Sequence, residues 1–215
     1  MIPFTCEKNN PKRFGTPRGK KVADRKPASR APLTSAPKNS LTTQGNKAIR
    51  VAICDGFSQA RTIQTTWKDF CREYLSVSVG FKTKQDSLKR RAFIGGPLSI
   101  ENGKRANNVH RRSLLTLDFD NVAEGIDISD IETFRPDVPF NNFAHSTFSH
   151  TPERPRLRII APLSREVNKR EYRFLVDEFC KRYFPVSVFG KPDRCSYTMN
   201  QIFFLPSHRI EACDE

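Results

Sequence analysis

The sequence predicts an α+β protein with a ferredoxin-like core at residues 113–215, in which the elements follow the order β-α-β-β-α-β. Apolar runs predict the four strands, which are expected at 113–120, 140–148, 156–161 and 201–205. Helical spacing of apolar residues predicts a long amphipathic helix before the last strand, and a short helix is expected at 128–134. Such a sheet buries one face under its two helices and leaves the other face open.

The long helix has a well-marked predicted start. Asn168 is followed three residues later by Glu171, which is the spacing of a capping box. An apolar face then follows helical spacing, and it consists of Tyr172, Leu175, Val176, Phe179 and Tyr183. We therefore expect a helix that begins directly after Asn168.

Residues 47–112 predict a smaller α/β unit beside this core. Alternating apolar residues at 49–54 predict a strand. Ser58 is a candidate helix cap, and the apolar face expected after it consists of Ile63, Trp67, Phe70, Cys71 and Tyr74. Short strands are expected at 77–81 and 92–94. The unit and the core together, residues 47–215, are expected to form one domain.

Positive charge is concentrated near the N-terminus. The chain carries a net charge of +14, and residues 1–50, with twelve Lys or Arg and two acids, account for +10 of it. Residues 1–46 hold six prolines and few large apolar side chains, which predicts a disordered basic tail. Two interpretations of the tail stay open, a solubilising segment and an arm that binds nucleic acid nonspecifically.

Cysteine usage and hydropathy indicate the cellular compartment in which the protein is expected. None of the six cysteines forms a CxxC pair or lies at metal-ligand spacing from a histidine, which argues against a zinc site and for reduced thiols. No run of about 18 apolar residues predicts a membrane span. The N-terminus also lacks the apolar stretch of a secretory signal, so a cytoplasmic location in a bacterium or its host is expected.

The sharpest candidate for chemistry is an Asp-x-Asp motif. Asp118 and Asp120 end a predicted buried strand, where residues two apart point to the same face. Neighbouring carboxylates repel each other unless a cation intervenes, and hard oxygen ligands favour Mg²⁺ or Mn²⁺. Asp193, in the loop before the last strand, is the candidate third catalytic acid and metal ligand. The alternative is that these acids are ordinary solvated residues of a strand end and a turn.

Polar and basic side chains follow the second strand of the predicted core. Arg156 and Arg158 are expected on one face of the next strand, where two guanidinium groups can bind phosphate oxygens. The segment before them contributes a cluster of His145, Ser146, Ser149 and His150. We predict a nucleotide-binding group that consists of Ser149, His150, Arg156 and Arg158. The alternative is a solvent-exposed strand face with surface charges.

Two basic runs lie upstream, around residues 82–91 and 105–112. Such runs are usually solvated surface, but beside a nucleotide site they suit contacts with the backbone of a template. The candidates for these nucleic-acid contacts are Lys82, Lys84, Arg105 and Arg111.

Three blocks in order carry a family resemblance. They are Leu117–Asp120, then Ser146–Arg158 with Pro162–Arg165, then Asp193 with Ile202–Ser207. Together they resemble the archaeo-eukaryotic primase superfamily, and most closely the primase–polymerase domains of phage and plasmid replication proteins, over about residues 105–207.

The resemblance implies a two-metal catalytic core on a sheet like that of the RNA-recognition motif (RRM). Asp118 and Asp120 match the family's first acidic pair, His150 its triphosphate contact, and Asp193 its last acid. Phe148 stands where the family has a small residue two positions before the histidine, so Ser149 or Ser146 would take that role.

These patterns predict a DNA primase or polymerase that uses Mg²⁺ or Mn²⁺. It would transfer nucleotides from nucleoside triphosphates, directed by a single-stranded DNA template, in the replication of a phage, plasmid or other mobile element. A separate replicative helicase is an expected partner. Two rival hypotheses are a non-catalytic replication-initiation or DNA-binding protein of the same fold and a metal-dependent nuclease.

Overall fold

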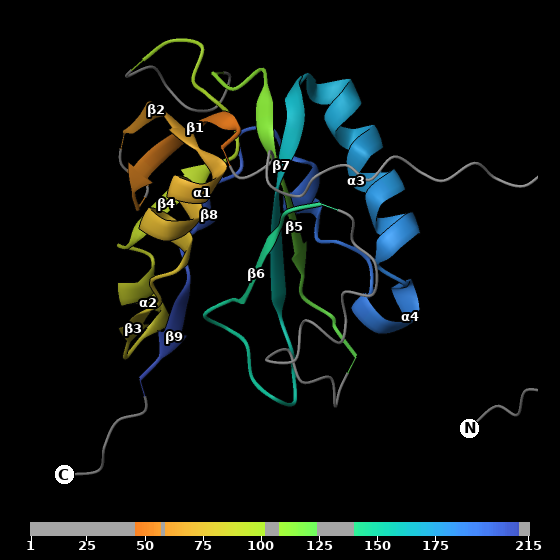
Figure 1. Cartoon of the computed structure of the whole chain (residues 1–215). Coiled ribbons are helices and arrows are strands. Elements are labelled where there is room, and N and C mark those ends of the chain that lie inside the picture. Colours follow the sequence, from red (N-terminus) through yellow and green to blue (C-terminus); the bar gives the residue numbers. More distant parts are fainter. Residues whose placement is uncertain (1–45, 57–58, 102–107, 124–139, 211–215) are drawn as a thin grey trace, which may run out of the picture. The chain divides into compact units, whose positions relative to one another are not determined.

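Three small β-sheets and four α-helices make up the part of the chain that the structure, a computed structural model, describes (Figure 1). The described residues are 46–56, 59–101, 108–123 and 140–210, and they lie in one compact unit, Ser40–Glu215. The α+β class is therefore confirmed. The basic tail up to residue 45 and the short helix expected at 128–134 fall outside the described residues.

The first sheet is antiparallel and has the strand order β2-β1-β4-β8. The predicted strands at 49–54 and 92–94 are confirmed as members of this sheet. Its strands are β1 (Ala48–Asp55), β2 (Ala60–Thr66), β4 (Arg91–Ile94) and β8 (Phe203–Phe204).

The helix expected after Ser58 begins later than predicted. Residues 60–66 form β2, because four of these seven residues are the β-branched Thr or Ile and the strand pairs with β1 along its whole length. Helix α1 (Trp67–Phe70) starts where the Thr66 side chain accepts a hydrogen bond from the backbone N–H of Asp69 at 3.1 Å. It continues as the π-helix Cys71–Leu75.

The second sheet has the order β5-β7-β6 and is also antiparallel. Its strands are β5 (Arg112–Phe119), β6 (Phe143–Ser146) and β7 (Leu157–Val167), so the third strand along the chain lies between the first two, as the split βαβ pattern requires. Helix α3 (Lys169–Tyr183) follows, and its capping box is confirmed: Asn168 Oδ1 accepts from the Glu171 N–H at 3.1 Å, and Glu171 Oε2 accepts from the Asn168 N–H at 2.9 Å.

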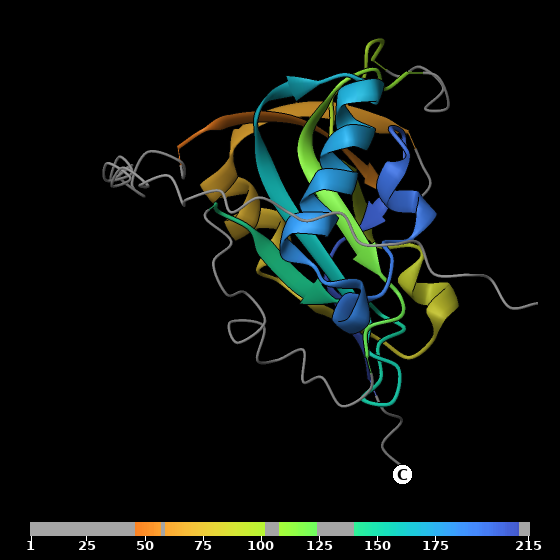
Figure 2. The same ribbon diagram turned by 90° about the vertical axis from the view of Figure 1, so that its right-hand side faces the viewer.

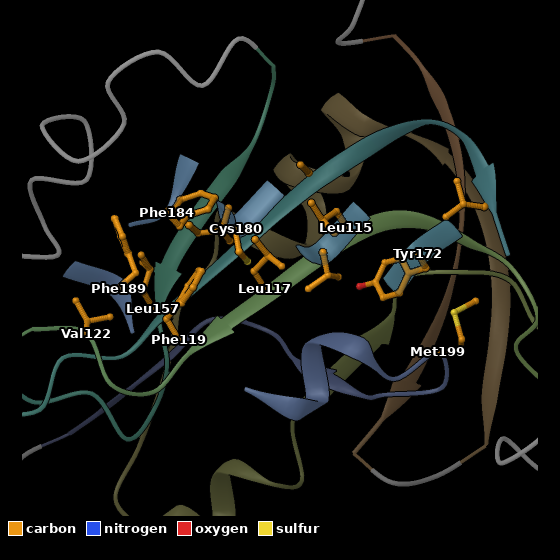
Figure 3. Close-up of a cluster of buried hydrophobic side chains, with 14 residues drawn as sticks. Leu115, Leu117, Phe119, Val122, Leu157, Tyr172, Cys180, Phe184, Phe189 and Met199 are labelled. Atoms are coloured by element: carbon orange, nitrogen blue, oxygen red, sulfur yellow. The ribbon is translucent and has the colours of Figure 1, made fainter. Parts of the chain in front are cut away.

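One face of the second sheet packs against α3 (Figures 2 and 3). Leu115, Leu117 and Phe119 alternate along β5 and are almost completely buried against α3, where they meet Tyr172 and Val176. From Leu114 to Phe119, strand periodicity therefore directs the odd-numbered residues to this core and the even-numbered residues to the opposite face; the register shifts between Arg112 and Leu114.

The opposite face is not open, which corrects the expected layering. Leu114 and Ile160 pack there with residues of the first sheet, including Val51, Phe93 and Phe203, so the two sheets and α3 form three layers (Figure 1). The expected position of the last strand is also wrong, because β8 pairs with β4 in the register Phe93↔Phe203. Phe203 is completely buried there, with its ring centroid 5.7 Å from that of Phe93, and this apolar burial favours the first sheet over extension of the second.

A parallel pair of short strands, β3 (Val79–Phe81) and β9 (Ser207–Arg209), forms the third sheet. Two further short helices are α2 (Lys84–Ser87) and α4 (Val186–Phe189). Among the described residues, no helix is long and apolar enough to cross a membrane.

Candidate functional site

A cavity of about 280 Å³ brings together three of the predicted acids. Asp118, Asp120 and Asp193 all line it. The basic side chains that line it are Lys84, Arg90, Arg156 and Arg158, and the remaining lining residues are Ser87, Leu88, Thr147, Phe148, Ser149, Cys195 and Phe204. Segments from four parts of the chain therefore meet at one polar cavity.

Asp118 lies in a row of polar residues that crosses the second sheet. In the strand registers, Arg158 of β7 is directly opposite Asp118 of β5 on one side and His145 of β6 on the other. Arg158 binds Asp118 through two parallel hydrogen bonds, Nε to Oδ1 at 2.7 Å and Nη2 to Oδ2 at 2.8 Å. Both side chains are about nine-tenths buried, so this is a bidentate ion pair shielded from water.

Burial and charge oppose each other at Asp118. Burial raises the pKa of this carboxyl, but the charge and hydrogen bonds of Arg158 lower it by more, and the net pKa lies below the ordinary value. Cys195 adds a weaker contact, Sγ to Oδ2 at 3.3 Å. Asp118 is therefore ionised at neutral pH, and both of its oxygens are engaged by protein groups.

A 3-10 helix, Arg194–Tyr197, explains how Asp193 reaches the end of β5. The backbone N–H of Asp193 donates to the carbonyl of Asp118 at 2.8 Å, and the Asp118 N–H donates to Ser196 Oγ at 2.9 Å. Asp193 caps this helix by accepting the Cys195 N–H at 2.8 Å. These bonds fix the last predicted acid beside the first two.

Asp120 is the more accessible acid of the pair. It follows β5, and its Oδ2 accepts a hydrogen bond from Arg156 Nη1 at 3.1 Å. Burial raises the pKa of Asp120, the charge of Arg156 opposes this, and the neighbouring carboxylates of Asp118 and Asp193 raise it further. The net pKa lies above the ordinary value, which is the direction that an added cation would reverse.

Two predicted phosphate ligands, Arg156 and Arg158, are thus paired with carboxylates. Arg158 also donates from Nη1 to the carbonyl of Phe204 at 2.7 Å, and its guanidinium lies 5.0 Å from the Phe203 ring centre. Arg158 is therefore held on three sides, and its clearest role is to position Asp118.

Among the clustered residues His145, Ser146, Ser149 and His150, Ser149 lines the cavity and His150 does not. His150 instead accepts the backbone N–H of Arg156 at its Nδ1, at 3.2 Å, and so stabilises the turn before β7. His145 is partly buried, and desolvation together with the charge of Arg158 lowers its pKa to about 3. Ser146 lies at the end of β6, and its carbonyl contacts His145 Nδ1 at 2.7 Å.

The basic candidates divide in the same way. Lys84 lines the cavity, whereas Lys82 and Arg111 are exposed and do not, and Arg105 lies outside the described residues. Arg90 also lines the cavity, although the sequence patterns do not single it out. Its guanidinium lies 4.6 Å from the Phe204 ring centre, and burial, together with the charge of Arg158, lowers its pKa to about 10. The basic run gives no signal that distinguishes Arg90 from its neighbours, because its position depends on β8.

The donor set suits a hard cation only in part. The three acids offer only oxygen atoms, which suit a hard cation, and the pKa of Asp120 is raised first by burial and then by the neighbouring carboxylates. However, Arg158 occupies both oxygens of Asp118, and the described residues contain no group of three or more His, Cys, Asp or Glu that could hold a metal ion as they stand. Asp118 would have to exchange Arg158 for a metal.

Comparison with known proteins identifies the family. The family model for the VapE N-terminal domain matches residues 49–213, and the chain belongs to this family. VapE proteins are associated with mobile elements. This match corrects the assignment to the archaeo-eukaryotic primase superfamily, which rested on three short motifs. No curated protein and no solved structure matched the chain.

Proposed function

We propose that the chain catalyses template-directed, metal-dependent nucleotidyl transfer, as a DNA primase or polymerase of a mobile element. The observation that carries the proposal is the convergence of Asp118, Asp120 and Asp193 with four basic side chains on one cavity. Carboxylates suit divalent cations, and basic side chains suit phosphates, so the lining offers both halves of a metal–nucleotide site.

Each group has a distinct role in this proposal. The three acids would hold Mg²⁺ or Mn²⁺, which when bound activates a hydroxyl nucleophile and neutralises charge on the phosphates. Lys84 and Arg90 would bind the phosphates, because neither forms a salt bridge among the described residues. A volume of about 280 Å³ is at the lower end for ligand pockets, which suits the triphosphate and leaves the base outside.

The test is incorporation of labelled nucleotide on a single-stranded DNA template with Mg²⁺ or Mn²⁺. Asp120→Asn is the preferred variant, because Asp120 is partly exposed and its loss leaves the buried pair intact. Incorporation should be abolished, while Glu178→Gln, an exposed acid of α3 outside the cavity, keeps the wild-type rate. Equal rates in the two variants would overturn the metal assignment.

A second variant pair tests the phosphate contacts. Lys84→Gln should raise the KM for nucleotide by roughly tenfold, the usual effect of one lost charge-assisted hydrogen bond. Lys82→Gln is the matched control, since Lys82 is exposed two residues away and does not line the cavity. An unchanged KM in Lys84→Gln would remove this lysine from the site.

A non-catalytic nucleic-acid-binding protein is the second candidate, and one observation favours it. Arg158 donates hydrogen bonds to both carboxylate oxygens of Asp118, which is the arrangement of a structural ion pair. Template binding without incorporation under any metal would select this candidate. Strand cleavage in the absence of nucleotide would select a nuclease instead.

A further inference from the structure

A second cavity, of about 400 Å³, lies at the first turns of α3. The family match and the proposed function assign nothing to it. Its lining comes from three segments: Val109 and His110 before β5, Lys169 and Arg173 of α3, and Tyr197, Thr198, Met199 and Asn200. The last segment is continuous with the 3-10 helix whose beginning carries Asp193 and Cys195 of the first cavity.

The charge of this lining is entirely positive. Lys169 and Arg173 are four residues apart on a helix, so their side chains lie on the same face, and the imidazole of His110 also lines the cavity. The lining contains no Asp or Glu, and among the described residues neither Lys169 nor Arg173 forms a salt bridge. Asp177, which does not line the cavity, accepts a hydrogen bond from the hydroxyl of the lining residue Tyr197 at 2.9 Å.

A buried arginine holds the wall of this cavity in place. Arg112 is completely buried and donates from Nη1 to the carbonyl of Met199 at 3.1 Å and from Nη2 to the Tyr172 hydroxyl at 2.9 Å. Its guanidinium lies 4.7 Å from the Tyr172 ring centre and 5.5 Å from that of Phe203. Among the described residues Arg112 has no carboxylate partner, so its charge adds to the positive potential behind the cavity wall.

We propose that this second cavity binds the phosphodiester backbone of a single-stranded nucleic acid. The basic side chains of Lys169 and Arg173, which have no carboxylate partner among the described residues, suit the phosphate oxygens of such a strand. The first cavity is linked to the second by the eight residues Asp193–Asn200. The two ends of this segment therefore each line one of the two cavities.

The choice of a nucleic-acid strand as the ligand rests on the proposed function. Binding of the strand to the second cavity, however, requires no nucleotidyl transfer. The test therefore measures binding of a fluorescent single-stranded oligodeoxynucleotide to the full chain, by anisotropy, in EDTA and without nucleotide. In these conditions a failure of the proposed catalysis has no effect on the result.

The informative variant is Lys169→Gln with Arg173→Gln. It should weaken strand binding by roughly tenfold or more, the usual effect of losing charge-assisted contacts, and reduce the slope of log affinity against log salt by about 1.4, or about 0.7 for each lost phosphate contact. The matched control is Arg170→Gln with Lys181→Gln, which removes the same charge from exposed positions of α3 outside the cavity.

Two results would overturn the proposal. Equal losses in both double variants would show that strand binding follows net charge alone. If Lys169→Gln with Arg173→Gln kept strand affinity and lost affinity for ATP or pyrophosphate, measured separately by calorimetry, the cavity would be a site for mononucleotide phosphates.

Discussion

Replacing Asp118 by alanine should destabilise the fold, whereas replacing Asp120 should not. Asp118 and Arg158 form a pair whose side chains are 11% and 10% exposed, and removal of one partner leaves the other as an uncompensated buried charge. Breaking such a pair costs about 3–5 kcal/mol. The pair of Asp120 and Arg156 is 37% and 19% exposed, and an ion pair near the surface contributes only about 0–1 kcal/mol.

The assay is urea unfolding followed by circular dichroism. The free energy of unfolding is extrapolated to water, and variants are compared where the slope of this free energy against urea concentration is the same. The double variant Asp118→Ala with Arg158→Met removes both charges and should recover much of the stability that Asp118→Ala loses. If Asp118→Ala and Asp120→Ala were equally stable, the ion pair would not be buried in solution. If the double variant were less stable than Asp118→Ala, an uncompensated Arg158 would not be the cause of the loss.

Three further changes have defined outcomes. The pKa of His145 lies at about 3, so between pH about 6.5 and about 3 the unfolded state binds a proton that the folded state does not. Stability should fall by about 1.4 kcal/mol per pH unit as the pH decreases through this window. Denaturation of His145→Phe should show a shallower pH dependence there. Asn168→Ala removes the α3 cap and should cost about 1 kcal/mol in the same assay, whereas Asn168→Asp should be close to neutral. Deletion of residues 1–46, which hold most of the net charge, should weaken DNA binding and flatten its salt dependence; unchanged binding would leave the solubilising interpretation.

Local patterns predicted the elements near the site better than their assembly. The apolar run of β5 and the capping box of α3 both lie within a few residues of sequence, and both are confirmed. The alternation along β5 also placed Leu117 on one face and Asp118 on the other, since that depends only on the two-residue period of a strand.

The errors concern pairings between distant segments. Nothing in residues 201–205 indicates whether they pair with β5 or with β4, because the choice depends on the burial of Phe203 between the two sheets. The same holds for Arg158, whose partner is set by the register of β7 on β5 over a separation of 40 residues. A sequence pattern could place a guanidinium on a strand face but could not show that an aspartate already binds it.

The ion pairs bear directly on the proposed function. With Arg156 on Asp120 and Arg158 on Asp118, the charges of these four side chains compensate each other in the absence of a ligand. A cation alone would have to displace two arginines from the aspartate carboxylates. A triphosphate alone would have to displace two aspartates from the arginine guanidinium groups. In the proposed function both would arrive together: the aspartates would bind the cation, and the arginines that they release would join Lys84 and Arg90 near the phosphates, so each of the four charges would keep a partner. Under that proposal the arginines predicted as phosphate ligands and the observed ion pairs would be compatible.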